Sequence, residues 1–395
     1  MTTLMILGAR MAQLPLIRTA LEDGFTVVSV DPDPQSPGHT LAHAAHTCDL
    51  ADADACIELA KQHRISGVVT LGADYPMSVL AQICDGLGLP GPQPDSVYCT
   101  IDKAAMRRAI GGHLHYEIST TADAIRAFRE IEAGVVIKPS VSSGGRGITI
   151  FPNQTAGDLV QRAFARAAGL SRNGRAILEA YIEGPEFSVE TITAGGETTV
   201  LAVTEKETSG PPYCVELAHC QPSKISPADY SALADEAVRG LRLLGVDDAP
   251  GHTEIRLTAS GPMIIEAAAR MGGGFIASHL TPLSTGIDMM RAAIAIALGQ
   301  VPDLRPRFAR GAASRFICPP AGYVRNATGL EKVLTDPDCI EADLYVTKGD
   351  QIRPLRDATD RVGHVITSGP TGSAAEKAAR RLANEIQLEV TPMIV

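Results

Sequence analysis

The sequence predicts an α/β protein whose middle part is richer in antiparallel strands, and three observations carry this prediction. Near the N-terminus, short apolar strands (4–7 and 25–30) flank a segment of helical spacing (11–22), which is typical of a βαβ unit with parallel strands. In the middle of the chain, β-branched runs follow one another with glycine turns between them, which indicates antiparallel strands. After residue 301, strands and a helix alternate again.

These changes in pattern predict boundaries near residues 112 and 301. We expect a doubly wound, Rossmann-like unit at 1–112, a middle block at 113–300 that mixes antiparallel strands with a few helices, and a small C-terminal α/β unit at 301–395. Asp102 is placed to cap a helix that follows it, and Ser373 is placed to cap the last helix, 373–385. The C-terminal unit carries no recognisable chemistry of its own.

Composition limits the classes of partner. The chain has 395 residues, a formal net charge of −10 and no run of Lys or Arg, which argues against nucleic acid or an anionic membrane surface. No apolar stretch approaches the length of a membrane span, and the N-terminus has neither a basic region nor a cleavage site. The eight cysteines form no CxxC pair, so buried thiols are favoured over a zinc site or disulfides. We expect a cytoplasmic protein.

A glycine- and serine-rich loop lies between two β-branched runs at 135–150. Its residues are Ser142, Ser143, Gly144, Gly145, Arg146 and Gly147, and Lys138 stands at the end of the entering strand. Glycine lets backbone N–H groups come close to an anion, and a lysine adds a compact positive charge. The loop therefore predicts a flexible hairpin that closes over a polyphosphate, with a ligand-free glycine hairpin as the alternative. A P-loop is excluded because no Gly-Lys-Ser/Thr opens a helix, and NAD binding is disfavoured because only Gly8 lies in the first turn.

Two glutamates lie on a predicted hairpin further along the chain. Glu254 and Glu266 are flanked by apolar residues such as Ile255 and Ile265. If both side chains face the same way, their like charges need a cation, and carboxylate oxygens suit Mg²⁺. The alternative is a pair of solvent-facing glutamates on an edge hairpin.

An arginine precedes a glycine run immediately after this hairpin. Arg270 can hold an anion with its planar guanidinium while the backbone at Gly273 and Gly274 approaches the ligand closely.

In this order and spacing, these residues together resemble the ATP-grasp superfamily over residues 1–300. The resemblance implies an ATP-grasp fold with a pre-ATP-grasp domain at 1–112, a lid subdomain at 113–190 and a metal-bearing subdomain at 191–300. It further implies that two lysines contact the nucleotide phosphates, that the glycine loop is the phosphate lid, and that a Glu-x-Tyr-Ile segment meets the adenine. The corresponding residues here are Lys103 and Lys138 for the phosphates, Glu179, Ala180, Tyr181 and Ile182 for the adenine, Glu186 for the ribose, and Glu254 and Glu266 for the metal. Without the resemblance, Lys103 is better explained as an ordinary solvated lysine.

One departure from the superfamily pattern points to a branch. Many ATP-grasp enzymes have Asn two residues after the second metal acid, whereas this chain has Ala268, so one metal contact should be missing or supplied elsewhere. The string Glu-x-Ala-Ala-Arg resembles the L-amino-acid ligase (dipeptide synthetase) branch, as does Glu-x-x-His at Glu216 and His219. The resemblance implies that Glu216 assists a metal or faces the substrate amine, that His219 lines an amino-acid pocket, and that Arg270 binds phosphate and the tetrahedral oxyanion. A structural role is the alternative for His219.

The function implied is an ATP-dependent carboxylate–amine ligase that forms an amide or peptide bond through an acyl phosphate. Its cofactors would be ATP and Mg²⁺, with one or two ions and with Mn²⁺ as an alternative metal. Its partners would be a small-molecule carboxylate and amine, with an amino acid as the expected substrate, and the family suggests a homodimer. The alternatives are a carboxylase or formyl-transferring enzyme of the purine or biotin type, and a non-catalytic nucleotide-binding protein. The sequence leaves the identity of both substrates open.

Overall fold

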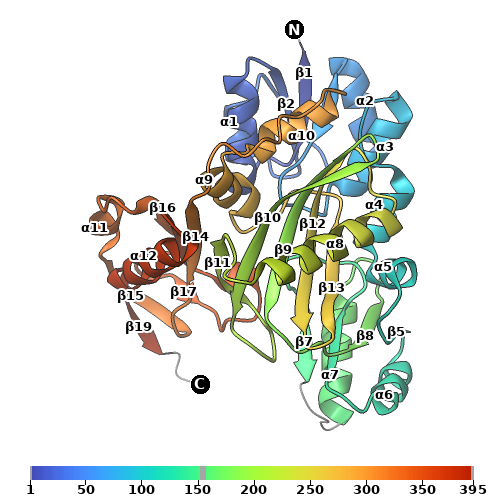
Figure 1. The fold of residues 1–395 in the computed structure, drawn as a ribbon, viewed down its shortest axis with the longest axis vertical. Coiled ribbons are helices and arrows are strands. Elements are labelled where there is room, and N and C mark those ends of the chain that lie inside the picture. Colours follow the sequence, from blue (N-terminus) through green and yellow to red (C-terminus); the bar gives the residue numbers. More distant parts are fainter. Residues whose placement is uncertain (1, 152–156, 393–395) are drawn as a thin grey trace.

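The computed structural model describes residues 2–151 and 157–392. Figure 1 shows the N-terminal sheet at one end of the molecule, a small sheet at the opposite end and long strands between them, with the C-terminal elements at one side. None of the helices in these two ranges has the length and apolar character that a membrane span requires.

The N-terminal sheet is parallel, with strand order β3-β2-β1-β4. Its elements are β1 (Thr3–Leu7), α1 (Leu14–Glu22), β2 (Thr26–Asp31), β3 (Ala44–Thr47), α2 (Ala53–His63), β4 (Gly67–Val69) and α3 (Met77–Leu87). The predicted βαβ start is confirmed. Strand β3 was not predicted because only Thr47 among its four residues is β-branched.

A four-stranded antiparallel sheet forms the opposite end, with order β5-β8-β6-β7. Its elements are β5 (His115–Ile118), α6 (Thr121–Glu130), β6 (Val135–Pro139), β7 (Thr149–Phe151), α7 (Gly157–Leu170) and β8 (Ala176–Ala180), and it is reached through α4 (Pro94–Ile101) and α5 (Lys103–Ile110). The predicted glycine hairpin is β6–β7, and we call its connecting residues 140–148 the lid loop. Asp102 caps α5 as predicted, because its carboxylate accepts from the N–H groups of Ala104 and Ala105.

The centre of the molecule is an eight-stranded antiparallel sheet with order β13-β12-β9-β10-β11-β14-β18-β16. Its strands are β9 (Glu186–Ala194), β10 (Glu197–Thr208), β11 (Glu216–Gln221), β12 (Ala249–Thr258), β13 (Gly261–Ala268), β14 (Gly311–Ile317), β16 (Cys339–Leu344) and β18 (Gly363–Gly369). Helix α8 (Pro227–Leu243) packs on the β12–β13 end of this sheet, and its Leu233, Ala237 and Leu241 are buried there. Helices α9 (Thr281–Thr285) and α10 (Met289–Ala297) connect β13 to β14.

The C-terminal segment extends the central sheet, because β14 pairs with β11 and β18 pairs with β14. A three-stranded sheet of β15 (Gly322–Thr328), β17 (Gln351–Ile352) and β19 (Gln387–Pro392) lies beside it, with helices α11 (Leu330–Leu334) and α12 (Gly372–Glu385). The predicted cap of the last helix is wrong by two residues. Thr371, with an extended backbone, accepts from the N–H of Ala374, whereas Ser373 lies within the first turn.

The contact between β14 and the start of α12 has no room for a side chain at Gly311. A Cβ atom added there would lie 1.9 Å from the carbonyl oxygen of Thr371. We expect Gly311→Ala to lower the free energy of unfolding by about 2–3 kcal/mol, because backbone must move to admit the methyl group. The measurement is urea unfolding followed by circular dichroism.

Gly86→Ala in α3 is the matched control. A Cβ at Gly86 meets nothing within 4 Å, so this variant should be stabilised by up to about 1 kcal/mol. Equal unfolding midpoints for Gly311→Ala and the wild type would show that the β14–α12 contact is not tight.

Candidate active site

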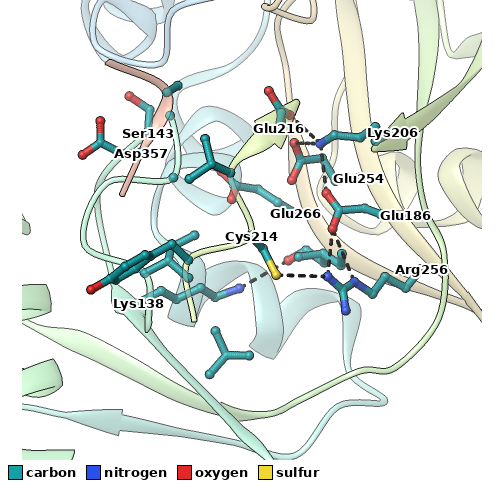
Figure 2. Close-up of a pocket in the computed structure, with 18 of the residues that line it drawn as sticks. Lys138, Ser143, Glu186, Lys206, Cys214, Glu216, Glu254, Arg256, Glu266 and Asp357 are labelled. Atoms are coloured by element: carbon teal, nitrogen blue, oxygen red, sulfur yellow. Dashed lines mark hydrogen bonds and ion pairs between the residues drawn. The ribbon is translucent and has the colours of Figure 1, made fainter. Parts of the chain in front are cut away.

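A cavity of about 340 Å³ opens among the four-stranded β5-β8-β6-β7 sheet, the central sheet and the C-terminal segment. Most of the predicted site residues line it: Lys138, Ser143, Gly144, Gly145, Glu179, Ala180, Tyr181, Ile182, Glu186, Glu216, Glu254, Glu266, Arg270, Gly273 and Gly274. Lys103, Ser142, Arg146, Gly147 and His219 do not belong to its lining. Figure 2 shows acidic and basic side chains from several strands turned toward one another at this place.

At one end of the cavity, Lys138 and Arg107 share the carboxylate of Glu179. The Nζ atom of Lys138 lies 2.5 Å from Glu179 Oε2, and the Nε atom of Arg107 donates to Oε1. Burial alone would raise the pKa of Glu179, but the charges of Arg107 and Lys138 outweigh burial and hold the pKa well below its ordinary value. Both oxygens of Glu179 are therefore engaged. In the segment that follows, the N–H groups of Ala180 and Tyr181 donate to Leu114 O and Gly134 O, and Ile182 O accepts from Arg256, so a ligand would meet the backbone groups of residues 180–182 that these bonds leave over.

Arg107 was not identified from the sequence. Its Nη1 atom donates to Ile264 O at 2.9 Å, and its Nη2 atom donates to Ile265 O on β13. The guanidinium thus fixes α5, β8 and β13 to one another at the wall of the cavity. No local motif marks such a residue, because its partners lie 72 or more positions away.

The acid predicted for the ribose, Glu186, has two basic partners in this structure. Its Oε1 atom lies 3.1 Å from Lys206 Nζ, and its Oε2 atom accepts from Arg256 Nη2 at 3.0 Å. Arg256 also donates to Tyr181 Oη at 2.8 Å and to Ile182 O at 2.7 Å. Arg256 therefore holds the 180–182 segment against the edge of the central sheet.

The two glutamates predicted for the metal lie directly opposite each other on β12 and β13. Residues opposite each other in an antiparallel pair project from the same face, so the alternative of two unrelated solvent-facing glutamates does not hold. Lys206 donates to Glu254 Oε1 at 2.7 Å, and Lys103 donates to Glu266 Oε1 at 3.1 Å. Within the described residues, Oε2 of neither glutamate has a hydrogen-bond partner, so two carboxylate oxygens are available to a hard cation.

No ready-made metal centre is present in the described parts of the chain, where no group of three or more His, Cys, Asp or Glu side chains has the necessary arrangement. Two carboxylates on one face still fit Mg²⁺, which takes one or two protein carboxylates and fills its remaining positions with water and phosphate oxygens.

The first predicted phosphate lysine, Lys103, is not a solvated lysine, because its side chain is buried. Its Nζ atom donates to Ser142 O of the lid loop at 3.0 Å as well as to Glu266. Lys103 therefore links the lid loop to the β12–β13 hairpin at the edge of the cavity.

Lys206 lies at the centre of a cluster of carboxylates, and no motif in the sequence marks its role. Its Nζ atom lies 2.7 Å from Glu216, 2.7 Å from Glu254 and 3.1 Å from Glu186, and its side chain is 1% exposed. Burial would lower the pKa of Lys206, but the three carboxylates raise it well above its ordinary value. Lys206 on β10 is paired with Glu186 on β9 in the register of the two strands. A correct prediction of this strand pairing would have placed Lys206 beside Glu186.

Arg270 is held by a residue of the N-terminal unit. Its Nε and Nη2 atoms donate to the two oxygens of Asp74 at 2.8 and 3.1 Å, a bidentate arrangement. Asp74 follows β4 in a loop that passes close to the glycine run, since a Cβ on Gly72 would lie 3.2 Å from Gly273 Cα. The predicted anion site therefore requires residues from two units.

His219 does not line the cavity, which corrects the sequence interpretation. It is buried behind Gly274, and its Nδ1 atom lies 3.0 Å from the carbonyl oxygen of that glycine. A Cβ on Gly274 would lie 2.6 Å from His219 Cε1, so the ring and the glycine run are packed against each other. Glu216, three residues earlier, is the member of the motif that reaches the cavity.

The C-terminal segment contributes to the cavity, although the sequence analysis found no chemistry in it. Asp357, Ala358 and Arg361 line the wall, and Asp357 lies beside Ser143 of the lid loop in Figure 2. The N–H of Ala358 donates to Gly144 O at 3.4 Å. The site is thus assembled from all parts of the chain.

Two family models match the chain. One describes an ATP-grasp domain and matches residues 131–279, and the other describes the L-amino acid ligase C-terminal domain 2 and matches residues 315–391. The crystal structure of an L-amino acid ligase from Bacillus licheniformis superposes with a TM-score of 0.85 at 22% identity and covers 99% of both chains.

Two curated relatives are similar in sequence. An uncharacterized protein, y4rH, of Sinorhizobium fredii is 29% identical over 357 residues, which are 87% of this chain and 73% of that protein. Human carnosine synthase 1 is 26% identical over 341 residues, which are 78% of this chain but 41% of that longer protein.

The superposition and the domain match over residues 131–279 show the fold of the ATP-grasp superfamily. Within that superfamily the chain resembles the L-amino-acid ligase branch, as the Glu-x-Ala-Ala-Arg and Glu-x-x-His strings predicted. Both levels of the predicted relationship are confirmed.

The Lys206 cluster allows a test of the cavity's electrostatics. We expect Lys206→Met to lower the free energy of unfolding by about 3–5 kcal/mol, because three carboxylates that face one another would lose their common cation. Urea unfolding measured by circular dichroism would give the change.

Lys224→Met serves as the control, since Lys224 forms a half-exposed ion pair with Glu376 far from the cavity. Its loss should cost less than about 1 kcal/mol. Similar decreases in the free energy of unfolding for Lys206→Met and Lys224→Met would contradict a central role of the Lys206 ammonium.

Proposed function

We propose that this protein is an ATP-dependent carboxylate–amine ligase that acts on an amino acid. The observation that carries the proposal is the pairing of Glu254 with Glu266 on one face of the hairpin, in the same cavity as Lys138, Arg270 and the lid loop. The confirmed resemblance to L-amino acid ligases supports the same reaction class.

The nucleotide end of the cavity is the end at β8. Apolar side chains of Val136, Ile148 and Ile150 line it, and the backbone of residues 180–182 offers hydrogen-bonding groups to a purine edge. Lys138 and the N–H groups of the lid loop at Ser143–Gly145 would meet the phosphates. Gly144 and Gly145 both have positive φ angles, a backbone state that suits glycine and can turn N–H groups inward.

Glu254 and Glu266 would hold Mg²⁺ through their free oxygens. When bound, the ion neutralises charge on the transferring phosphoryl group and orients it. Ala268 stands where many relatives have an Asn ligand, so we propose that the two glutamates and the nucleotide supply the coordination, with the number of ions to be measured.

The chain's own groups would act in two steps. In the first, a substrate carboxylate oxygen attacks the γ-phosphorus of ATP, ADP leaves and an acyl phosphate forms while Lys138 and Arg270 offset the negative charge. In the second, the amine nitrogen attacks the carbonyl carbon, the C–O bond to phosphate breaks, and the nitrogen loses a proton. Arg270 would stabilise the tetrahedral oxyanion, and the closed lid loop would keep water from the acyl phosphate.

The direct test is a screen for ADP and phosphate release over pairs of the twenty standard amino acids, with mass spectrometry of the products. Parallel reactions contain bicarbonate or formate in place of an amino acid. Amide products with stoichiometric ADP would support the ligase. Turnover with bicarbonate or formate alone would assign the carboxylase or formyl-transfer alternative, and ATP binding without turnover on any substrate would indicate a non-catalytic role.

Arg270 provides a test of the mechanism. We expect Arg270→Ala to reduce kcat roughly a hundredfold or more, since one oxyanion donor is typically worth about 3 kcal/mol, while the KM for ATP changes little. Arg291→Ala, which removes a half-exposed arginine of α10, is the control. Near-wild-type turnover of Arg270→Ala would remove this residue from the mechanism.

Glu266 provides a test of the metal site. Glu266→Gln keeps the size of the side chain but removes its charge, so we expect Mg²⁺-dependent ADP formation to be lost. The rise in Tm that Mg²⁺ and ATP together give the wild type should shrink as well, because ligand stabilisation follows binding to the native state. Glu331→Gln on the exposed helix α11 is the control. An unchanged Tm response would refute the metal assignment.

A further inference from the structure

The glycine run that follows Arg270 ends at a residue with an unusual backbone. Phe275 has a φ angle of +69°, and Gly274 before it has a φ angle of +59°. Phe275 immediately precedes a short π-helix, η3 (Ile276–Leu280). A left-handed backbone is unstrained in glycine but strained in a bulky aromatic residue, so it persists only where neighbouring groups hold it. The surroundings of Phe275 must therefore supply that support.

The backbone on both sides of Phe275 belongs to the wall of the cavity. Gly273, Gly274 and Ile276 line the cavity, whereas Phe275 does not. Gly273 O accepts from the N–H of Ile276, and Gly274 O accepts from His219. Among the described residues, the N–H groups of Gly273 and Gly274 have no hydrogen-bond partner. Two unpaired N–H groups in a cavity wall are available to an oxygen atom that gains negative charge.

The ring of Phe275 packs against aromatic side chains of the C-terminal segment. Its centre lies 4.3 Å from that of His364 on β18, with 30° between the ring planes. It lies 6.0 Å from the centre of Phe316 on β14, with 26° between the planes. Both contacts are stacked arrangements, which attract aromatic rings to one another. His364 and Phe316 are themselves buried, so the Phe275 ring has little freedom to move.

Hydrogen bonds fix the plane of the His364 ring. Its Nδ1 atom lies 2.7 Å from Tyr345 Oη, and its Nε2 atom lies 3.0 Å from Glu341 Oε1. The other carboxylate oxygen of Glu341 lies 3.3 Å from Nε2 of His279 on η3, whose ring meets Phe275 edge-on with the ring centres 5.6 Å apart. Because both ring nitrogens of His364 are engaged, the imidazole cannot turn away from Phe275 without breaking hydrogen bonds.

We propose that Phe275 is a positioning residue for the second step of the reaction. Its ring, held by the C-terminal strands, keeps its own backbone left-handed. That turn directs the N–H groups of Gly273 and Gly274 to the place where the tetrahedral oxyanion forms beside Arg270. The inference rests on the proposed ligase function and gives a role to the C-terminal segment, in which the sequence analysis found no chemistry.

The test measures the two steps separately. Rapid-quench reactions with the full-length enzyme in excess over ATP give the rate of ADP formation for the first step and the rate of amide formation for the second. They contain Mg²⁺ and the substrate pair that the screen above identifies. An oxyanion forms at the carbonyl carbon only in the second step, so a misplaced N–H group should slow amide formation and spare ADP formation.

For Phe275→Ala we expect unchanged ADP formation and amide formation that is slower by roughly tenfold or more. Phe275→Gly removes the same ring but adopts the left-handed backbone without strain, so its amide formation should be about fivefold faster than that of Phe275→Ala. A ring that only filled the core would give the opposite order, because glycine is the more flexible residue and leaves the larger cavity.

His364 variants test the support of the ring. His364→Ala should slow amide formation in the wild type but have little further effect in Phe275→Gly, because the ring that His364 holds is then already absent. His364→Phe keeps a stacking ring and should recover part of the loss. The control, Tyr323→Ala, removes an exposed ring of β15 and should leave both rates at their wild-type values.

Two results would overturn the inference. One is amide formation in Phe275→Gly that is no faster than in Phe275→Ala. The other is an equal fall in the rates of ADP and amide formation in both Phe275 variants, which would assign the ring to the first step or to folding alone. Absence of ADP release by the wild type across the whole screen would instead reject the ligase function, and this inference with it.

Discussion

The ammonium of Lys206 lies between three carboxylates that come from three strands, and the rest of the site depends on this contact. Glu186, Glu216 and Glu254 are largely buried and could not face one another without a cation at the centre, because poorly screened like charges repel strongly at low dielectric. By supplying that cation from β10, the chain fixes the three acids before any ligand arrives. Oxygen atoms that Lys206 does not use remain turned toward the cavity.

At the other end of the cavity, buried carboxylates are likewise paired with basic side chains. Lys138 and Arg107 neutralise Glu179, and Lys103 neutralises Glu266, so each buried charge has a partner from a different element. Charge pairs of this kind contribute little net stability, because desolvation offsets most of their attraction. Their effect is to fix positions. A side chain that meets a phosphate or a carbonyl oxygen is useful only if it is already oriented, which is what such pairs provide.

Local patterns in the sequence predicted a large part of the fold and of the site. The βαβ start, the glycine hairpin, the Asp102 cap and the facing glutamates are each encoded within one short stretch of chain, where alternation and turn chemistry can be read directly. The order of these motifs along the chain resembles that of a known superfamily, and this resemblance connected them into one predicted site. The Ser373 cap was wrong because two neighbouring hydroxyl residues, Thr371 and Ser373, can both serve, and backbone geometry decides between them.

The parts that could not be predicted depend on pairings between distant segments. Arg107, Asp74 and Lys206 each contact side chains on other secondary-structure elements, and nothing in their own neighbourhoods distinguishes them from surface charges. Arg361 reaches the cavity only because β14 and β18 continue the central sheet. His219 is the opposite case. The sequence motif that contains it was recognised, but Gly274 packs against its imidazole ring, so the ring lies behind the cavity wall.

One contact described above joins the two ends of the cavity mechanically. Gly144 of the lid loop accepts a hydrogen bond from Ala358, and Ala358 also accepts from Arg361. Any movement of the lid loop away from Ala358 would break that bond and remove one support from the peptide unit beside the guanidinium. A ligand that favours one position of the loop would then change the affinity of the cavity wall at Arg361 for its own ligand, and reciprocity would require the same change in return.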